Sequence, residues 1–304
     1  ENIRGGESLL SEEGLFSGPF WNMFDWSGAD QDQDTVLHNT MFLVGAIDAA
    51  LKCARAIGDK QHGSWLRGLR KRLVHAVNAL WDNKKKAYPD SIRNDGTISP
   101  SVCTHTSFLS ILYDIVEEKN YDAALRNVLA PPKGMVGIGS PFAFLYLYET
   151  LEKVGCEKEI LDSIYKYYIP MVDRGETTVT ERLGIDNDHR SRAHAWSSSP
   201  SYFLNRIVLG IKQTAAGGKA FEVSPLLNDL SWAEGSVATP HGAVQVKWEI
   251  IGRQLKVAIT APSGVKVKFK ANESHRGLNA VVAASAAQSS FHARGNDGAL
   301  PSKI

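Results

Sequence analysis

The stretch TVLHNTMFLVGAIDAALKCARAIGDKQHGSWLRGLRKRLVHAVNALW, residues 35–81, contains two helical patterns in succession. In residues 35–58 most apolar side chains fall on one helical stripe, and Gly58 is a typical residue to end such a helix. The same pattern returns in residues 63–81, and only residues 59–62 lie between the two. The stretch therefore predicts an antiparallel pair of helices joined by a tight turn.

Similar helical patterns continue along the chain. Ser140 can cap a helix, Pro141 suits its first position, and Gly155 ends the apolar pattern that follows. In total, the sequence predicts five further helices, which form two more pairs and one single helix. They are expected at 104–117, 119–129, 141–154, 157–169 and 199–210.

The connections between these helices are uneven in length. They are short within each pair and long between pairs, and a long segment also precedes the first helix. In stacked antiparallel hairpins all long connections share one end, and function often lies on such loops. The pattern predicts a repeated α-hairpin solenoid or a closed αα toroid with one elaborate face. The long segments are 16–34, 82–103, 130–139 and 170–198.

The pattern changes after the helical part, which we place at residues 1–213. Apolar and polar residues then alternate, which predicts half-buried antiparallel strands within a small β-domain over 214–271. The alternating runs are 244–250, 255–259 and 265–269. Residues 272–304 lose this periodicity and are predicted to be a disordered or non-native tail. The alternative is one alanine-rich helix over 278–288.

Composition excludes several classes of partner and cofactor. The 304 residues carry a formal net charge of +1, which gives no electrostatic reason to expect nucleic acid or an anionic membrane as a partner. No apolar run approaches the length of a membrane span. The three cysteines form neither a metal motif nor a disulfide framework, and no zinc, phosphate-loop or dinucleotide motif occurs. No cofactor or metal is therefore expected.

Two of the long segments carry residues suited to carbohydrate chemistry. PFWNMFDW, residues 19–26, places Trp21, Phe24 and Trp26 beside Asp25. Aromatic faces can stack on the C–H faces of sugar rings, and a carboxylate can accept hydrogen bonds from hydroxyl groups. The alternative is a hydrophobic plug beside the helix, because aromatic residues dominate protein cores.

The longest segment includes RGETTVTERLGIDNDHRSRAHAWSSSP, residues 174–200. The β-branched run TTVT favours extended backbone and could hold Glu181 rigidly. Glycoside hydrolysis needs two carboxyl groups, one acid and one base or nucleophile. The alternative is that Glu181 makes an ordinary surface ion pair.

Several motifs resemble those of one enzyme family. They are FDW at 24–26 with the helix that follows, GIGSPFAFLYLYETLEKVG at 137–155, GETTVTER at 175–182 and SRAHAWSSSPSYFLNRIVLGI at 191–211. Over about residues 20–270 the chain resembles the C-terminal portion of an inverting α-L-rhamnosidase of the glycoside hydrolase family 78 type. The resemblance implies an (α/α)6 barrel, here with about seven of its twelve helices, followed by a small β-sandwich.

The resemblance also implies roles for particular residues. Glu181 matches the general base, which would deprotonate the attacking water, and His194 matches a histidine that bonds the sugar. Trp26 matches an aromatic wall of the rhamnose pocket, with Asp25 beside it. Trp196 would either line the same pocket or pack where the last helix starts. The implied ligand is a rhamnose-containing glycoside or polysaccharide.

Two departures from the family pattern affect these expectations. Thr180 stands where the family often has tryptophan, so an apolar wall would be lost there. The acidic segment that holds the family's general acid has no counterpart in the sequence, and we expect it upstream of residue 1. The isolated chain is then expected to be weakly active or inactive, and to self-associate through uncovered helix faces. A non-catalytic carbohydrate-binding remnant and a helical-repeat scaffold are the alternatives.

Overall fold

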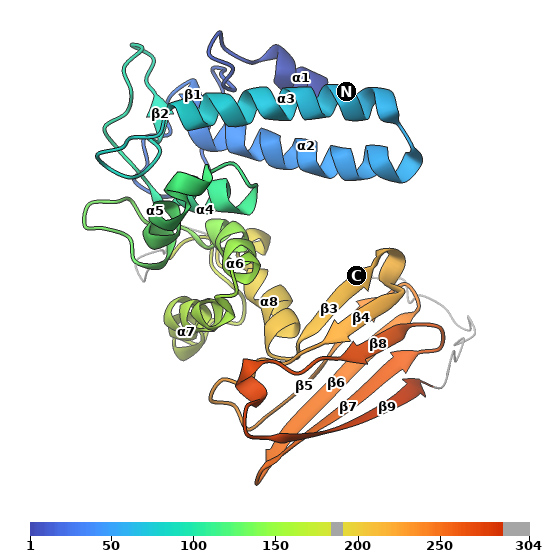
Figure 1. Ribbon diagram of the computed structural model, residues 1–304. Helices are drawn as coiled ribbons and strands as arrows, with labels where there is room; N and C mark the ends of the chain where they lie inside the picture. The colour runs from blue at the N-terminus through green and yellow to red at the C-terminus, as the bar shows by residue number, and fades with distance from the viewer. Residues whose placement is uncertain (184–190, 288–304) are drawn as a thin grey trace, which may run out of the picture. The chain divides into compact units, whose positions relative to one another are not determined.

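A computed structural model describes residues 1–183 and 191–287 of the chain (Figure 1). The chain forms two compact units, Glu1–Pro200 and Ser201–Ile304. Paired helices make up the first unit and β-strands dominate the second. The predicted fold class, a helical hairpin domain followed by a β-domain, is confirmed.

The helices of the first unit form three antiparallel hairpins, α2–α3, α4–α5 and α6–α7. All seven predicted helices are present, and α1 is an additional short helix that the polar, glycine-containing sequence NIRGGES did not reveal. A short 3-10 turn, Pro141–Ala143, precedes α6. The helices are α1 (Asn2–Ser8), α2 (Leu37–Ile57), α3 (Lys60–Ala79), α4 (Thr104–Leu112), α5 (Glu118–Leu129), α6 (Phe144–Lys153), α7 (Glu157–Asp173) and α8 (Ser199–Ile207).

Two adjacent residues produce the tight turn of the first hairpin. Gly58 adopts a left-handed conformation with φ of 73°, which ends α2 at no steric cost. Asp59 then caps α3, because its side chain accepts a hydrogen bond from the backbone N–H of His62. The turn that the sequence predicts is therefore formed by a glycine stop followed directly by an acidic cap.

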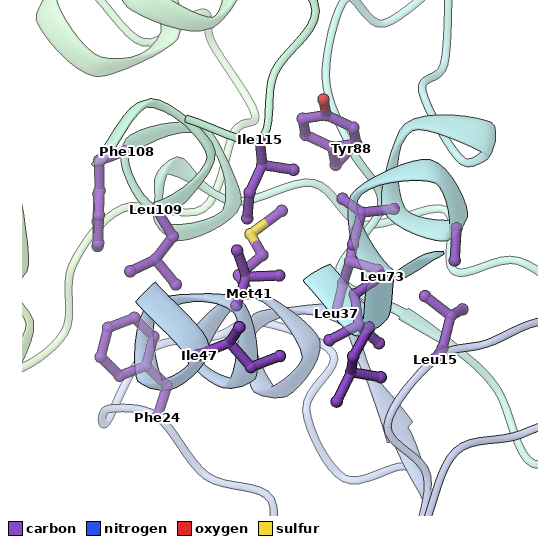
Figure 2. Close-up of a cluster of buried hydrophobic side chains, with 14 of the residues drawn as sticks. Leu15, Phe24, Leu37, Met41, Ile47, Leu73, Tyr88, Phe108, Leu109 and Ile115 are labelled. Carbon is purple, nitrogen blue, oxygen red and sulfur yellow. The ribbon is translucent and has the colours of Figure 1, made fainter. Parts of the chain in front are cut away.

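Side chains of the first hairpin form much of the hydrophobic core. Leu37, Met41 and Ile47 of α2 are fully buried in one cluster with Leu73 of α3 and Leu109 of α4 (Figure 2). Their spacing along α2 places them on one side of the helix. This shared core fixes the helix ends from which the long loops emerge.

The long loops come together, as the uneven connections predict. Strand β1 (Thr35–Val36), which follows the first loop, pairs antiparallel with β2 (Ser91–Ile92) in the second. A parallel bridge between Cys103 and Val136 joins the second loop to the third. Backbone hydrogen bonds thus tie successive long loops to one another at one end of the hairpins.

The second unit contains two packed β-sheets, with strand orders β3-β4-β8 and β5-β6-β7-β9. Their shared core includes Phe221, Val246, Trp248 and Val257. The Trp248 indole N–H donates to the carbonyl of Val208 over 2.8 Å, so its buried polar atom is satisfied. The strands are β3 (Ile211–Ala215), β4 (Ala220–Val223), β5 (Trp232–Thr239), β6 (Gly242–Ile251), β7 (Gln254–Pro262), β8 (Lys266–Phe269) and β9 (Asn279–Ala287).

The β-unit differs from its prediction in two places. Strand β8 was expected to continue an antiparallel meander, but it pairs parallel with β4 in the other sheet. Residues 279–287, expected to belong to a tail or an alanine-rich helix, form β9 and pair parallel with β7. Alternation indicates which face of a strand is buried and not which strand lies beside it, and Ala and Ser carry little strand preference. The remaining tail, 288–304, lies outside the described residues.

Candidate active site

Asp25 of the first long loop is held by backbone hydrogen bonds from two segments of the chain. Its carboxylate accepts hydrogen bonds from the backbone N–H groups of Ser27 at 3.0 Å, Gly139 at 2.9 Å and Ser140 at 3.2 Å. The side chain is 0% exposed. Its carboxylate is enclosed and its oxygens bond to the protein backbone, which indicates a structural role, and sugar contact by Asp25 stays an untested prediction.

A buried histidine lies beside this carboxylate. The Nε2 atom of His105 is 3.2 Å from Asp25 Oδ2, and the His105 side chain is 2% exposed. Burial opposes ionisation of Asp25, but His105 and hydrogen bonds from Ser27 and from the Gly139 backbone outweigh it and lower the pKa of this carboxyl group. Asp25 thus stays charged and holds the first loop against the start of the third hairpin.

The close contact of these two segments also requires a glycine. A Cβ atom added at Gly139 would lie 2.0 Å from the carbonyl oxygen of Trp26. No side chain fits at that position without moving the backbone of Trp26. Asp25 and Gly139 together fix the backbone from which the Trp26 side chain projects.

Trp26 and Glu181, which the sequence places on different loops, are in direct contact. The Trp26 indole N–H donates to Glu181 Oε1 over 2.8 Å. The backbone N–H of Ser191 lies 3.4 Å from the other carboxylate oxygen, Oε2. Both side chains are partly exposed. Glu181 is therefore oriented through both of its oxygens while remaining accessible to solvent.

Arg182 completes this arrangement. Its guanidinium carbon lies 3.7 Å from the centre of the Trp26 ring, the geometry of a cation–π contact. On the same loop, the exposed Trp21 lies 6.1 Å from Trp26 between ring centres. The sequence reasoning missed Arg182, although its position next to Glu181 was a usable signal.

The backbone around Glu181 folds against the segment that begins at Ser191. The N–H of Glu181 donates to the carbonyl of Ser191 at 3.0 Å, and the N–H of His194 donates to that of Val179, also at 3.0 Å. The Ser197 hydroxyl donates to the carbonyl of Thr180 at 2.7 Å. These bonds tie the TTVT run to residues 191–197, although residues 177–178 form a bend and the run is not a strand. Residues 184–190 of the same loop lie outside the described residues.

Trp196 packs within an aromatic group rather than alone. Its ring stacks on that of Phe142, with ring centres 5.2 Å apart. The centre of the His194 ring lies 4.3 Å from the centre of the Trp196 ring. The Trp196 indole N–H donates to the Glu181 carbonyl over 3.1 Å. His194 and Trp196 are thus brought to Glu181, and both remain partly exposed.

Phe24 and Thr180 are buried and have structural roles. Phe24 is buried in the core, where it contacts Phe42 and His105, so the plug interpretation holds for this residue. Thr180 is buried and its hydroxyl lies 3.6 Å from Met171 Sδ, so its side chain does not form part of an exposed wall. The aromatic stretch 19–26 therefore serves both core and surface.

The described residues contain no group of three or more His, Cys, Asp and Glu side chains arranged to hold a metal ion. The three cysteines, Cys53, Cys103 and Cys156, are free thiols.

No helix in the described part of the chain has the length and apolar character needed to cross a membrane. Among the described residues, the site offers a carboxylate, indoles, an imidazole and a guanidinium group.

Comparison with known proteins identifies the family. Residues 10–208 match the bacterial α-L-rhamnosidase six-hairpin glycosidase domain, and residues 210–283 match the bacterial α-L-rhamnosidase C-terminal domain. The chain belongs to the bacterial α-L-rhamnosidase family. The family suggested by the motifs around Trp26 and Glu181 is therefore confirmed.

Individual relatives agree with this assignment. An α-L-rhamnosidase of Formosa agariphila is 23% identical over 256 residues, which cover 79% of this chain and 26% of the relative. An α-L-rhamnosidase from an Alteromonas species is 22% identical over 259 residues, which cover 78% of this chain and 26% of the relative. The chain thus spans about a quarter of the length of these curated relatives.

Solved structures show the same fold. A family 78 rhamnosidase of a Bacillus species superposes with a TM-score of 0.86 and 31% identity, covering 94% of this chain and 31% of that one. The α-L-rhamnosidase of Dictyoglomus thermophilum gives a TM-score of 0.69 at 17% identity. The match covers 88% of this chain and 31% of that one, and it supports the fold alone. The three hairpins described here therefore correspond to part of a six-hairpin domain.

Proposed function

We propose that this chain is part of an inverting α-L-rhamnosidase and that Glu181 is its general base. The observation that carries the proposal is the 2.8 Å hydrogen bond from the Trp26 indole to Glu181, which orients an accessible carboxylate beside aromatic rings. Family membership supports the glycosidase chemistry. The substrate would be a terminal α-L-rhamnoside.

In this mechanism Glu181 removes a proton from a water molecule as that water attacks the anomeric carbon. A general acid on the opposite side of the sugar protonates the departing glycosidic oxygen. Inverting enzymes keep the two carboxyl groups roughly 6.5–9.5 Å apart to leave room for the water. Glu181 must be ionised to act as a base, and N–H donors from Trp26 and Ser191 favour a charged carboxylate.

Aromatic residues near Glu181 would form the sugar pocket. We assign Trp26 and Trp196 as walls against the sugar ring and His194 as a hydrogen-bonding partner of a hydroxyl group. The α-L-rhamnosidase of Streptomyces avermitilis has been solved in complex with L-rhamnose. That enzyme is 18% identical to this chain, so it supports the class of ligand and not individual contacts.

The general acid is the missing element of this mechanism. No motif in the 304 residues matches the family's acid, and we propose that it lies in a segment preceding this chain. Acid catalysis typically contributes about 10²–10⁴-fold to the rate. The 304-residue chain alone should therefore release little or no rhamnose, and the longer polypeptide should be active.

The stereochemistry of the product tests this proposal. Proton NMR of the longer polypeptide acting on an aryl α-L-rhamnoside should show β-L-rhamnose as the first product, before mutarotation. α-L-Rhamnose as the first product would contradict an inverting mechanism. Rapid release of rhamnose by the 304-residue chain alone would contradict the need for a separate acid.

The second candidate function is sugar binding without catalysis. The aromatic group formed by Phe142, His194 and Trp196 favours it over a helical scaffold for protein partners, because these rings gather beside Glu181. Calorimetry with L-rhamnose separates these two alternatives. Heat of binding at millimolar sugar, lost in Trp196→Ala, would support a sugar site, and no heat would argue against one.

A further inference from the structure

The four-stranded sheet of the second unit carries a groove with a volume of about 350 Å³. The strands that form it, β5, β6 and β7, lie side by side in Figure 1. Each of these three strands contributes two of its main lining side chains. They are Glu234, Ser236, Gln245, Lys247, Ala258 and Thr260.

The strand register arranges these side chains in two rows. Glu234 pairs with Lys247, and Lys247 pairs with Ala258, while Ser236, Gln245 and Thr260 form the adjacent row. Because alternate residues of a strand share one face, both rows lie on the same side of the sheet. A short side chain at Ala258, next to longer neighbours, leaves the hollow. The groove therefore follows from the pairing of these three strands.

An exposed tryptophan continues the same face. Trp232 lies two residues before Glu234 on β5 and is 62% exposed. Tryptophan is on average largely buried in folded proteins, so a broad exposed ring beside a polar groove is uncommon. With a rise of about 3.3 Å per residue, Trp232, Glu234 and Ser236 extend over roughly 13 Å. This length suits a short chain of sugar rings rather than a single small molecule.

The charges in the groove indicate what kind of ligand it suits. Lys247 Nζ lies 3.1 Å from Glu234 Oε2, and both side chains are more than half exposed. Their charges compensate each other, which leaves no net charge to attract an anion or a cation. The remaining lining offers hydroxyl and amide groups that can both donate and accept hydrogen bonds. A neutral, polyhydroxylated ligand matches this lining.

We propose that this groove binds a neutral oligosaccharide chain, with Trp232 stacking on a sugar ring and Glu234, Gln245 and Lys247 bonding its hydroxyl groups. The site is formed by residues other than those around Glu181. If the proposed rhamnosidase activity is correct, the groove would hold the polysaccharide from which terminal rhamnose is removed. Binding itself does not depend on that activity.

The test uses the full 304-residue chain with Glu181→Gln, so that catalysis plays no part in the measurement. Affinity is measured by calorimetry against maltohexaose, cellohexaose and a neutral rhamnose-containing oligosaccharide. We expect at least one of these to bind, and Trp232→Ala to weaken its binding by about tenfold or more. Tyr202→Ala is the matched control, because Tyr202 is also an exposed aromatic residue of this unit and does not line the groove. Circular dichroism verifies the fold of each variant.

Three results would overturn the proposal. The first is no binding to any of the three probes, and the second is equal affinity in the Trp232→Ala and Tyr202→Ala variants. The third is binding that Trp26→Ala abolishes and Trp232→Ala leaves intact, because it would assign the sugar to the Glu181 site. None of them bears on whether Glu181 is a catalytic base, so the two proposals can fail separately.

Discussion

Trp26 and Glu181 lie 155 residues apart in the sequence, yet a 2.8 Å hydrogen bond joins their side chains. Both Glu181 carboxylate oxygens accept N–H groups, from Trp26 and Ser191, and the Arg182 guanidinium group lies over the Trp26 ring. A carboxylate held in this way loses less conformational entropy when it activates water. At the residue scale, the site therefore depends on how firmly Trp26 is held.

Replacing Trp26 by Phe keeps an aromatic ring and removes the N–H donor. A hydrogen bond to a charged group is worth about 1.5–3 kcal/mol, so kcat of the longer enzyme should fall by roughly 10- to 150-fold. Steady-state kinetics on an aryl α-L-rhamnoside measure this effect. Trp21→Phe serves as the control, because Trp21 is an exposed neighbour of the same ring. Equal losses in the two variants would show that the indole donor has no special role.

The backbone of Trp26 can be tested through Gly139. Alanine at this position would place its Cβ 2.0 Å from the Trp26 carbonyl oxygen, so Gly139→Ala should lower the free energy of unfolding by about 3 kcal/mol or more. Gly137→Ala is the control, since a Cβ there meets nothing within 4 Å. Urea unfolding of both variants measures the difference. Similar stability in the two would contradict a tight contact at Gly139.

At the scale of elements, helix α2 links the hydrophobic core to the first long loop. Its inner side chains, Met41 and Ile47 among them, are buried against neighbouring helices, and its first turn places His38 beside Phe24 of the loop. Burial lowers the pKa of His38 from 6.5 to about 3, so its imidazole is neutral in the folded chain. The first turn of α2 therefore places an ionisable side chain, His38, within the buried core.

This histidine gives the folded chain a pH dependence. Below pH 6.5 the unfolded chain binds a proton at His38 that the folded chain excludes, so stability falls with falling pH. The free energy of unfolding should drop by about 2 kcal/mol between pH 7.5 and pH 5 because of this group. The neighbouring His105 and Asp25 face it, and the lowered pKa of Asp25 places the titration of that carboxyl below this range.

The variant His38→Gln isolates this contribution. Its unfolding free energy should vary less between pH 7.5 and pH 5 than that of the parent chain, as measured by urea unfolding at each pH. His62→Gln is a suitable control, because His62 is an exposed residue of α3. An unchanged pH slope in His38→Gln would contradict the burial of a neutral imidazole at this position.

At the scale of the whole molecule, the order of paired helices and strands could be predicted from periodicity and stop signals such as Gly58. The partners of β8 and β9 could not, because strand pairing depends on residues far apart in the sequence. The same limit applies to the site. Glu181 and Trp26 were identifiable from motifs, whereas the enclosure of Asp25 by Gly139 and Ser140 required the tertiary structure.

The chain also represents only part of its family's architecture. It spans about a quarter of the curated relatives and contains three of the hairpins of a six-hairpin domain. Self-association of the isolated chain and the position of the general acid in a preceding segment both stay predictions. If both predictions hold, the 304-residue chain supplies a base but no acid, and activity is expected only in the longer polypeptide.

The proposed role of Glu181 as general base is tested most directly by one pair of variants. In the longer polypeptide, Glu181→Gln should lower kcat on an aryl α-L-rhamnoside by about 10²–10⁴-fold and leave the fold intact. Glu176→Gln, on the same loop, removes an ion pair with Arg192 at 3.1 Å and should keep kcat within a few-fold. Activity retained in Glu181→Gln, or lost equally in both variants, would contradict the assignment.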